Sequence, residues 1–258
     1  MTILDIRDLR QSYGKFAPVL RGVSVKVDHG EFVGIIGPSG AGKSTLLRCI
    51  NRLVDAQEGV ILIPGQLVNG AGNGAIDILK LSGADLRRAR RKMGMIFQQF
   101  NISTRLSVVQ NVLSGGLGYQ PTLRSTLRIF SRHEQRQALI NLKRVGLLDH
   151  AYKRADELSG GEQQRVAIAR TLMQDPAIIL ADEPVSNLDP RLSRIVLDIL
   201  KRVCREDGIT VLVSLHTLEL TREYADRVIG LKDGQIVFDG SPQELTDRAV
   251  DSVYQRGG

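Results

Sequence analysis

A phosphate-binding pattern between a strand and a helix is the feature that most constrains the fold of this 258-residue chain. Residues 37–45 read G-P-S-G-A-G-K-S-T and match the pattern G-x-x-x-x-G-K-[ST] at every fixed position. Before them, Phe32–Ile36 is an uninterrupted apolar run, typical of a strand covered on both faces. After them, the apolar residues between Ser44 and Leu53 recur with helical spacing. This unit predicts an α/β fold in which helices pack on a mostly parallel sheet.

The glycines of the loop indicate its chemistry. They let backbone N–H groups turn inward, so that phosphate oxygens lie in a ring of donors at a helix N-terminus. We expect Lys43 to neutralise the β- and γ-phosphates of a nucleotide and Ser44 to bind Mg²⁺. A glycine-rich turn with a chance lysine is the alternative, but it does not explain the flanking strand and helix. The expected phosphate contacts are Gly37, Pro38, Ser39, Gly40, Ala41, Gly42, Lys43, Ser44 and Thr45.

A second apolar run ends in two carboxylates. Residues 178–181 are a predicted buried strand, and Asp182 and Glu183 follow it directly. A strand terminus near the phosphate loop suits a magnesium-organising aspartate, so Asp182 takes that role. Glu183 is then placed to polarise the attacking water as a general base. The alternative is a solvated acidic pair at a strand end, which the phosphate loop makes a poorer explanation.

A second glycine-rich element has no role in a pocket that already has phosphate-binding glycines. Ser159, Gly160 and Gly161 precede a helical pattern over 166–173, and Glu162 follows them. A helix start without side-chain bulk lets a γ-phosphate approach its free N–H groups. An ordinary N-cap with a flexible turn is the alternative. Because the first loop already supplies phosphate-binding glycines, this second Ser-Gly-Gly instead suggests that two copies of the chain close over shared nucleotide.

The remaining patterns divide the chain. Residues 99–157 show short helical patterns, and Ser131 with Glu134 predicts a capping box that opens a helix. The apolar positions of that helix are Ala138, Leu139, Leu142 and Val145. We expect one domain over 1–258, with a nucleotide-binding core at 1–98 and 158–258 and a helical subdomain at 99–157.

Strands and helices alternate in the rest of the core. Residues 64–75, rich in glycine and asparagine, are predicted to be an exposed loop, and Asp233-Gly234 predicts a late hairpin turn. The other predicted elements are strands at 3–9, 23–27, 60–63, 177–181 and 210–214 and helices at 190–206 and 217–226.

Composition excludes several classes of protein. No apolar run approaches the roughly 20 residues of a membrane-spanning helix, and the first residues lack a signal-peptide layout. Cys49 and Cys204 have neither disulfide-framework nor zinc-ligand spacing. The net charge of +7 favours anionic partners without choosing among nucleotide, nucleic acid and lipid. We therefore expect a cytosolic chain whose membrane role, if any, depends on a separate partner.

Together these motifs resemble the nucleotide-binding subunits of ATP-binding-cassette transporters over residues 3–245. By matching position, Tyr13 resembles the aromatic residue that stacks on adenine, and Gln98 the glutamine that links the metal site to the helical subdomain. His216 resembles the switch histidine at the γ-phosphate, and 186–189 the loop that crosses the dimer interface. For each of these residues taken alone, the alternative is an ordinary packed or surface side chain without a role in the site. The resemblance implies an antiparallel β subdomain beside the parallel sheet.

The resemblance also implies a mechanism and partners. Two subunits pack head to tail, and Lys43 of one and Ser159–Gly161 of the other hold each ATP with Mg²⁺. Glu183, His216, Gln98 and Lys43 carry catalysis, with Ser44, Gln98 and Asp182 at the metal. The partners implied are a second copy, an integral membrane permease dimer and, indirectly, a periplasmic solute-binding protein. The expected location is the cytoplasmic face of the bacterial inner membrane, as a peripheral subunit.

Only resemblance to known families indicates the transported solute. The runs at 47–53, 93–101, 105–108, 117–119 and 223–231 look most like bacterial phosphonate-import ATPases. The insert at 69–74 and the residues Ser214–Thr217 around the histidine depart from that group. Phosphite or another oxyanion therefore stays open, with polar amino-acid import as the runner-up. We expect no substrate-sensing domain after Leu245.

Two other classes fit less well. A soluble cassette ATPase acting on DNA or ribosomes usually has coiled-coil insertions or two cassettes, and a small-molecule kinase leaves 158–162 and His216 unexplained.

Basic segments are interpreted separately. The run Arg87–Lys92 is predicted to be a solvated helix face rather than a nucleic-acid site, because no aromatic residues are interleaved with it. We therefore expect no nucleic-acid partner. Arginines over 124–132 are a hypothetical contact for phospholipid head groups, which unchanged membrane association after their replacement by serine would contradict.

Overall fold

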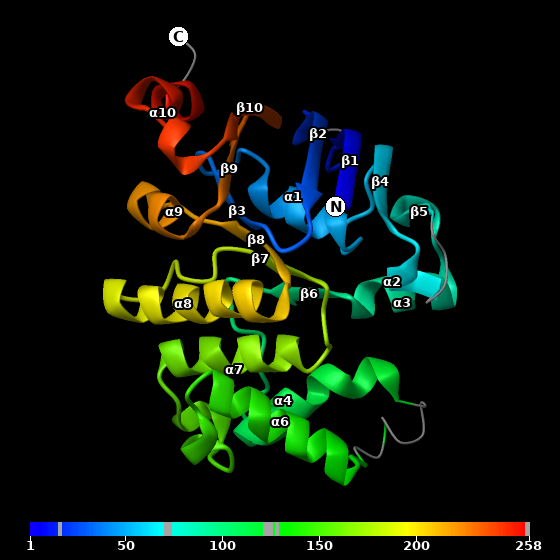
Figure 1. Ribbon diagram of the computed structural model, residues 1–258, viewed down its shortest axis with the longest axis vertical. Coiled ribbons are helices and arrows are strands. Elements are labelled where there is room, and N and C mark those ends of the chain that lie inside the picture. The colour runs from blue at the N-terminus through cyan, green and yellow to red at the C-terminus, as the bar shows by residue number, and fades with distance from the viewer. Residues whose placement is uncertain (15–16, 70–73, 121–125, 127–128, 256–258) are drawn as a thin grey trace.

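The computed structural model describes residues 1–14, 17–69, 74–120, 126 and 129–255. Its central sheet has six strands in the order β10-β9-β3-β8-β7-β6 (Figure 1). The five strands from β9 to β6 are parallel, and β10 pairs antiparallel with β9 at one edge. The predicted α/β architecture is confirmed. The strands are β3 (Phe32–Ile36), β6 (Met93–Ile96), β7 (Ile178–Ala181), β8 (Thr210–Ser214), β9 (Arg227–Lys232) and β10 (Gln235–Gly240).

A second, antiparallel sheet lies beside the first, in the order β2-β1-β4-β5. Strand β2 largely alternates buried and exposed residues because only one of its faces packs on the core, whereas β3 and β8 are buried along their whole length. The antiparallel β subdomain implied by the resemblance is therefore present. Its strands are β1 (Thr2–Gln11), β2 (Leu20–Asp28), β4 (Glu58–Pro64) and β5 (Ala75–Asp77).

Helices cover both faces of the central sheet (Figure 1). On one face α1 packs with the antiparallel sheet, and on the other α8 and α7 separate the sheet from α4 and α6. The helices are α1 (Lys43–Ile50), α2 (Gln66–Asn69), α3 (Gly83–Arg91), α4 (Val108–Ser114), α6 (Arg132–Arg144), α7 (Gly160–Leu172), α8 (Pro190–Asp207), α9 (Leu218–Tyr224) and α10 (Asp247–Tyr254). Short 3-10 turns are η1 (Ile78–Lys80), η2 (Gly115–Tyr119), η3 (Leu148–His150), η4 (Ala155–Glu157) and η5 (Pro242–Glu244).

The segment 99–157 contains helices and no named strand among its described residues. Its apolar residues form one continuous core with α7, α8 and a face of the central sheet, in which Val112, Leu142 and Ile168 are fully buried. The boundary of the helical subdomain at 157 stays a prediction, because α7 packs against α4 and α6 from outside it. No helix in the described part of the chain combines the length and apolar character needed to cross a membrane.

Two local predictions need correction. Helix α1 ends at Ile50 rather than continuing to Leu53, because Arg52 adopts a left-handed φ of 56°. The loop predicted over 64–75 contains the short helix α2, whose Val68 is buried. The rest of the Gly/Asn-rich insert, 70–73, lies outside the described residues, as do Arg124 and Arg128 of the predicted lipid-contacting segment.

The basic run is only in part a solvated helix face. Arg87 and Arg88 are exposed on α3, as predicted. Arg90 donates to the carbonyl oxygens of Asn51 and Arg52, and so closes the end of α1. Arg91 lies over the ring of Tyr119, and Lys92 pairs with Asp175 at 2.8 Å. The carboxyl-terminal half of this run therefore joins the sheet to α7 and η2.

The capping box predicted at Ser131 is present and supplies a test of the fold. Ser131 Oγ accepts from the N–H of Glu134, while the Glu134 carboxylate accepts from the N–H of Ser131 at 2.6 Å. Ser131→Ala should lower the free energy of unfolding, measured by urea titration, by about 1 kcal/mol. Arg136→Ala on the exposed face of the same helix should change it by less than about 0.5 kcal/mol. Equal effects of the two substitutions would contradict this role of the cap.

Candidate functional site

The predicted phosphate loop joins β3 to α1 in a conformation that requires glycine at two positions. Gly37 has φ of 148°, and a Cβ there would lie 2.0 Å from the carbonyl oxygen of Leu231. Gly42, the residue before α1, has φ of 103°, and its Cβ would lie 2.9 Å from the carbonyl oxygen of Val19. The loop backbone therefore passes where any side chain would collide. Its N–H groups precede the first turn of α1, whose donors have no partner within the helix.

Lys43 lies inside this loop. Its side chain is buried, and Nζ donates to the carbonyl oxygens of Gly37 at 2.8 Å and Pro38 at 3.1 Å. Burial lowers the pKa of the Lys43 ammonium, and the nearby carboxylates of Glu183 and Asp182 oppose that shift. The ammonium is thus held inside the loop, against two of its carbonyl oxygens.

Asp182 accepts hydrogen bonds from three other side chains at the site. It follows β7, and its side chain is 3% exposed. Oδ1 accepts from Ser44 Oγ at 2.7 Å and from Ser214 Oγ at 3.3 Å, and Oδ2 accepts from Arg48 Nη2 at 3.1 Å. The sequence prediction that Ser44 and Asp182 share one site agrees with this hydrogen bond.

These oxygens suit a magnesium ion bound together with a nucleotide. Mg²⁺ prefers oxygen ligands, and it usually takes one or two from the protein and the rest from water and phosphate. The Ser44 hydroxyl and the Asp182 carboxylate supply such a pair next to the phosphate loop. Within the described residues, no group of three or more His, Cys, Asp or Glu side chains is placed to hold a metal ion alone.

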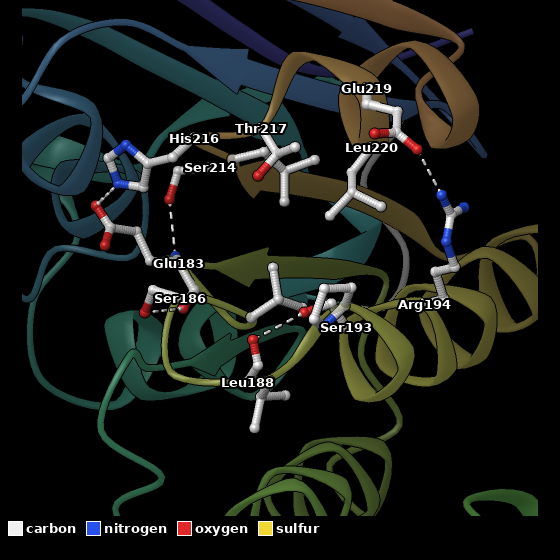
Figure 2. Close-up of a pocket in the computed structure, with 13 residues that line it drawn as sticks. Glu183, Ser186, Leu188, Ser193, Arg194, Ser214, His216, Thr217, Glu219 and Leu220 are labelled. Carbon is white, nitrogen blue, oxygen red and sulfur yellow. Dashed lines mark hydrogen bonds and ion pairs between the residues drawn. The ribbon is translucent and has the colours of Figure 1, made fainter.

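Glu183 and His216 face each other at the carboxyl ends of β7 and β8 (Figure 2). Glu183 Oε1 lies 2.5 Å from His216 Nε2, and Glu183 has a left-handed φ of 48°. Both residues line a cavity of about 480 Å³ together with Ser186 and Leu188. The structure therefore brings together Glu183, assigned to the water from its place after a strand, and His216, assigned to the γ-phosphate by the resemblance.

Gln98 lies at the same edge of the sheet. It is exposed and comes two residues after the end of β6, whose last residue Ile96 pairs in register with Ala181. The carboxyl ends of β6 and β7 are thus adjacent. Gln98 follows β6, and Asp182 follows β7 at the same edge of the sheet.

The second glycine-rich element begins helix α7. Ser159 is the N-cap, and it forms a capping box in which Glu162 Oε2 accepts from the Ser159 N–H at 2.8 Å and from its hydroxyl at 2.6 Å. These hydrogen bonds lower the pKa of Glu162. Gly161 packs against Leu192 of α8, where a Cβ would lie 2.9 Å from Cδ1. Glu162 therefore closes the helix start, and its contact with nucleotide stays a prediction.

The two glycine-rich elements lie apart within one chain. Among the described residues, no hydrogen bond or ion pair joins residues 159–162 to the loop 37–45. Leu158 and Ala41 belong to different apolar cores, and α1 and α7 lie on opposite sides of the central sheet (Figure 1). The second element therefore has no described contact with the phosphate loop of its own chain.

The remaining predicted residues lie around this edge. Tyr13 is 43% exposed, and its hydroxyl lies 3.3 Å from Thr45 Oγ1, so that its ring flanks the end of the phosphate loop. In the predicted interface loop, Asp189 accepts from the N–H of Leu192 at 2.9 Å and caps α8.

Sequence reasoning missed Arg48 and Ser214. Arg48 follows Ser44 by four residues, so helical spacing alone places both side chains on one face of α1. Ser214 ends a buried strand, and only its hydroxyl distinguished it from its apolar neighbours.

Known proteins resemble this chain over most of its length. The family described as ABC transporter matches residues 20–186. The phosphonates import ATP-binding protein PhnC 2 of Oceanobacillus iheyensis is 50% identical over 254 residues, which cover 98% of this chain and 96% of that protein. The phosphonates import ATP-binding protein PhnC of Staphylococcus saprophyticus is 48% identical over 256 residues, covering 99% and 96% of the two chains.

Solved structures with this fold include a dimeric one. The ATP-binding cassette MJ0796, in a dimeric post-hydrolysis state bound to ADP and Pi, has a TM-score of 0.78 and 33% identity. It covers 93% of this chain, and 99% of its own length is matched. The ADP conformation of the cassette MJ1267 has a TM-score of 0.80 and 27% identity, covering 98% of each chain.

Proposed function

This chain belongs to the ABC transporter family, and we propose that it is the ATP-hydrolysing subunit that powers import of phosphonate through a separate membrane permease. The assignment of phosphonate as the transported solute is supported by the 48–50% identity, over nearly the whole chain, to phosphonate-import ATP-binding proteins. Phosphite or a related oxyanion remains the nearest alternative, because the solute itself binds to other chains. Import of a polar amino acid is a more distant alternative.

The phosphate loop binds the nucleotide in this proposal. Its N–H groups and Lys43 neutralise the β- and γ-phosphates, and Tyr13 stacks on the adenine. When bound, Mg²⁺ neutralises phosphate charge, and Ser44, Asp182 and Gln98 are the residues that hold it.

Hydrolysis then depends on Glu183 and His216. The Glu183 carboxylate accepts a proton from the attacking water, and His216, which contacts that carboxylate, donates to the γ-phosphate. Lys43 and the N–H groups of the loop stabilise the charge on the transferring phosphoryl group. Glu183 and His216 come from adjacent parallel strands, so the sheet holds their relative positions.

A second copy completes the site. Ser159, Gly160 and Gly161 of the partner subunit's α7 provide N–H groups for the γ-phosphate, since within one chain this helix start lies away from the phosphate loop. Because ATP binds the closed pair better than the open pair, its hydrolysis releases the two copies. Gln98 and the helices of 99–157 pass this motion to a permease dimer, and a periplasmic solute-binding protein delivers the cargo. The subunit itself is peripheral, on the cytoplasmic face of the membrane.

Reconstitution tests this proposal. The chain, its membrane permease and the cognate solute-binding protein are assembled in lipid nanodiscs, and ATP hydrolysis is measured with and without added solute. Methylphosphonate should raise the rate by about tenfold, because the loaded solute-binding protein favours the closed pair. Phosphite, phosphate and glutamine, each added alone, identify the alternatives. A rate that responds to glutamine and not to methylphosphonate would contradict phosphonate import.

A further inference from the structure

The hydroxyl of Ser214 joins the two carboxylate residues of the site. Ser214 is the last residue of β8 and is fully buried. Its Oγ accepts a hydrogen bond from the N–H of Glu183 at 2.8 Å (Figure 2). The same oxygen lies 3.3 Å from Asp182 Oδ1 and donates its proton to it. The Ser214 hydroxyl thus accepts from Glu183 through a lone pair and donates its proton to Asp182 at the same time.

The backbone of Glu183 depends on this contact. The ladder between β7 and β8 ends at the pair Ala181 and Val213, so the residues that follow β7 have no backbone partner on β8. The N–H of Asp182 bonds to the carbonyl oxygen of Ile96 on the other side of the strand. Glu183 then turns into the left-handed region, with φ of 48°. Non-glycine residues adopt this conformation at a cost, so it persists only where neighbouring contacts hold it.

We propose that Ser214 is a positioning residue for ATP hydrolysis. Its hydroxyl holds the backbone of the general base Glu183 in the left-handed conformation and fixes that residue relative to the metal-facing carboxylate of Asp182. This inference rests on the proposed role of Glu183. Removing the hydroxyl leaves the N–H of Glu183 without this partner and frees Glu183 to relax away from the attacking water.

The position of Ser214 predicts which kinetic constant changes. Ser214 contacts neither the phosphate loop nor Tyr13 through any described hydrogen bond, so ATP affinity should change little. Misplacement of the base acts on the chemical step, and kcat should fall about tenfold or more. If Ser214 only stabilised the fold, its replacement would lower the melting temperature without lowering kcat at an unchanged KM.

The test uses three substitutions and a control on the same strand. Ser214→Ala and Ser214→Val remove the hydroxyl, while Ser214→Thr keeps it in a side chain of the same shape as valine. Thr210→Val is the control. Thr210 is also fully buried on β8, and its hydroxyl accepts from the N–H of Gly30 at 2.9 Å, at the opposite end of the strand.

For each variant, kcat, KM for ATP, the equilibrium affinity for ATP in EDTA and the melting temperature are measured. The expected result is a kcat lowered about tenfold in the Ala and Val variants, with KM within about twofold and with activity retained in the Thr variant. Thr210→Val should lower the melting temperature and leave kcat within about twofold.

Unchanged kcat in Ser214→Ala, or equal losses in the Thr and Val variants, would overturn the inference. Glu183→Gln is measured alongside to separate two failures. If Glu183→Gln is inactive and Ser214→Ala is fully active, only the role of Ser214 is wrong. If Glu183→Gln is active, the proposed general base is wrong as well.

Discussion

Glu183→Gln should bind ATP as tightly as the unchanged chain and hydrolyse it about 10²–10⁴-fold more slowly. The substitution keeps the size of the side chain and removes the base that accepts a proton from water. Glu183 lines the cavity at the ends of β7 and β8, and its carboxylate contacts His216 at 2.5 Å. The phosphate contacts assigned to Lys43 and the loop do not involve it. Single-turnover hydrolysis and equilibrium binding of a fluorescent ATP analogue measure the two effects separately.

Glu206→Gln is the matched control, since Glu206 is an exposed glutamate on α8. It should leave both hydrolysis and binding unchanged. Near-normal turnover by Glu183→Gln would remove Glu183 from the role of general base. His216 is the next residue to test in that case, because it is the other titratable group that contacts this carboxylate.

Ser159→Arg should abolish hydrolysis while leaving ATP binding to a single chain largely intact. The phosphate loop lies on the other face of the central sheet from α7, so a bulky cation at residue 159 does not reach it. In the closed pair, however, the arginine occupies the space in front of the N–H groups of Gly160 and Gly161. Loss of even one such donor to a developing charge costs roughly 10²–10³-fold in rate.

Ser131→Arg controls for the loss of the cap. Ser131 and Ser159 both open a helix with a capping box, so both substitutions remove the same hydrogen bonds. The two variants should lose similar stability, about 1 kcal/mol each. Only Ser159→Arg should lose hydrolysis. If Ser159→Arg failed to bind ATP, the site would not be shared between copies in the way proposed.

The central sheet could be predicted because its strands have strong local patterns. Phe32–Ile36 is an apolar run and Thr210–Ser214 has three apolar residues at its centre, and the structure buries every residue of both. The turn at Asp233 was predictable for a similar reason, since Asp-Gly allows the positive φ values of 47° and 76° found there. The capping box at Ser131 is equally local.

What the sequence did not predict depends on contacts between distant segments. Helix α2 forms in a stretch of turn-forming residues because Val68 is buried against the antiparallel sheet. Half of the basic run is not solvated, because Asp175 and Tyr119 meet it from segments far along the chain. Ser214 and Arg48 reach Asp182 only when β8 and α1 pack beside β7. The spacing of Arg48 places it beside Ser44, but neither segment indicates a contact with Asp182.

The most direct test of a nucleotide shared between two copies is the mass of the Glu183→Gln chain in solution with ATP. Multi-angle light scattering at protein concentrations up to about 100 μM should give one chain without nucleotide or with ADP, and twice that mass with ATP and Mg²⁺. Introducing Ser159→Arg into the same chain should return the mass to that of one chain. A Glu183→Gln protein that binds ATP and remains a single chain, even with its permease present, would contradict the account.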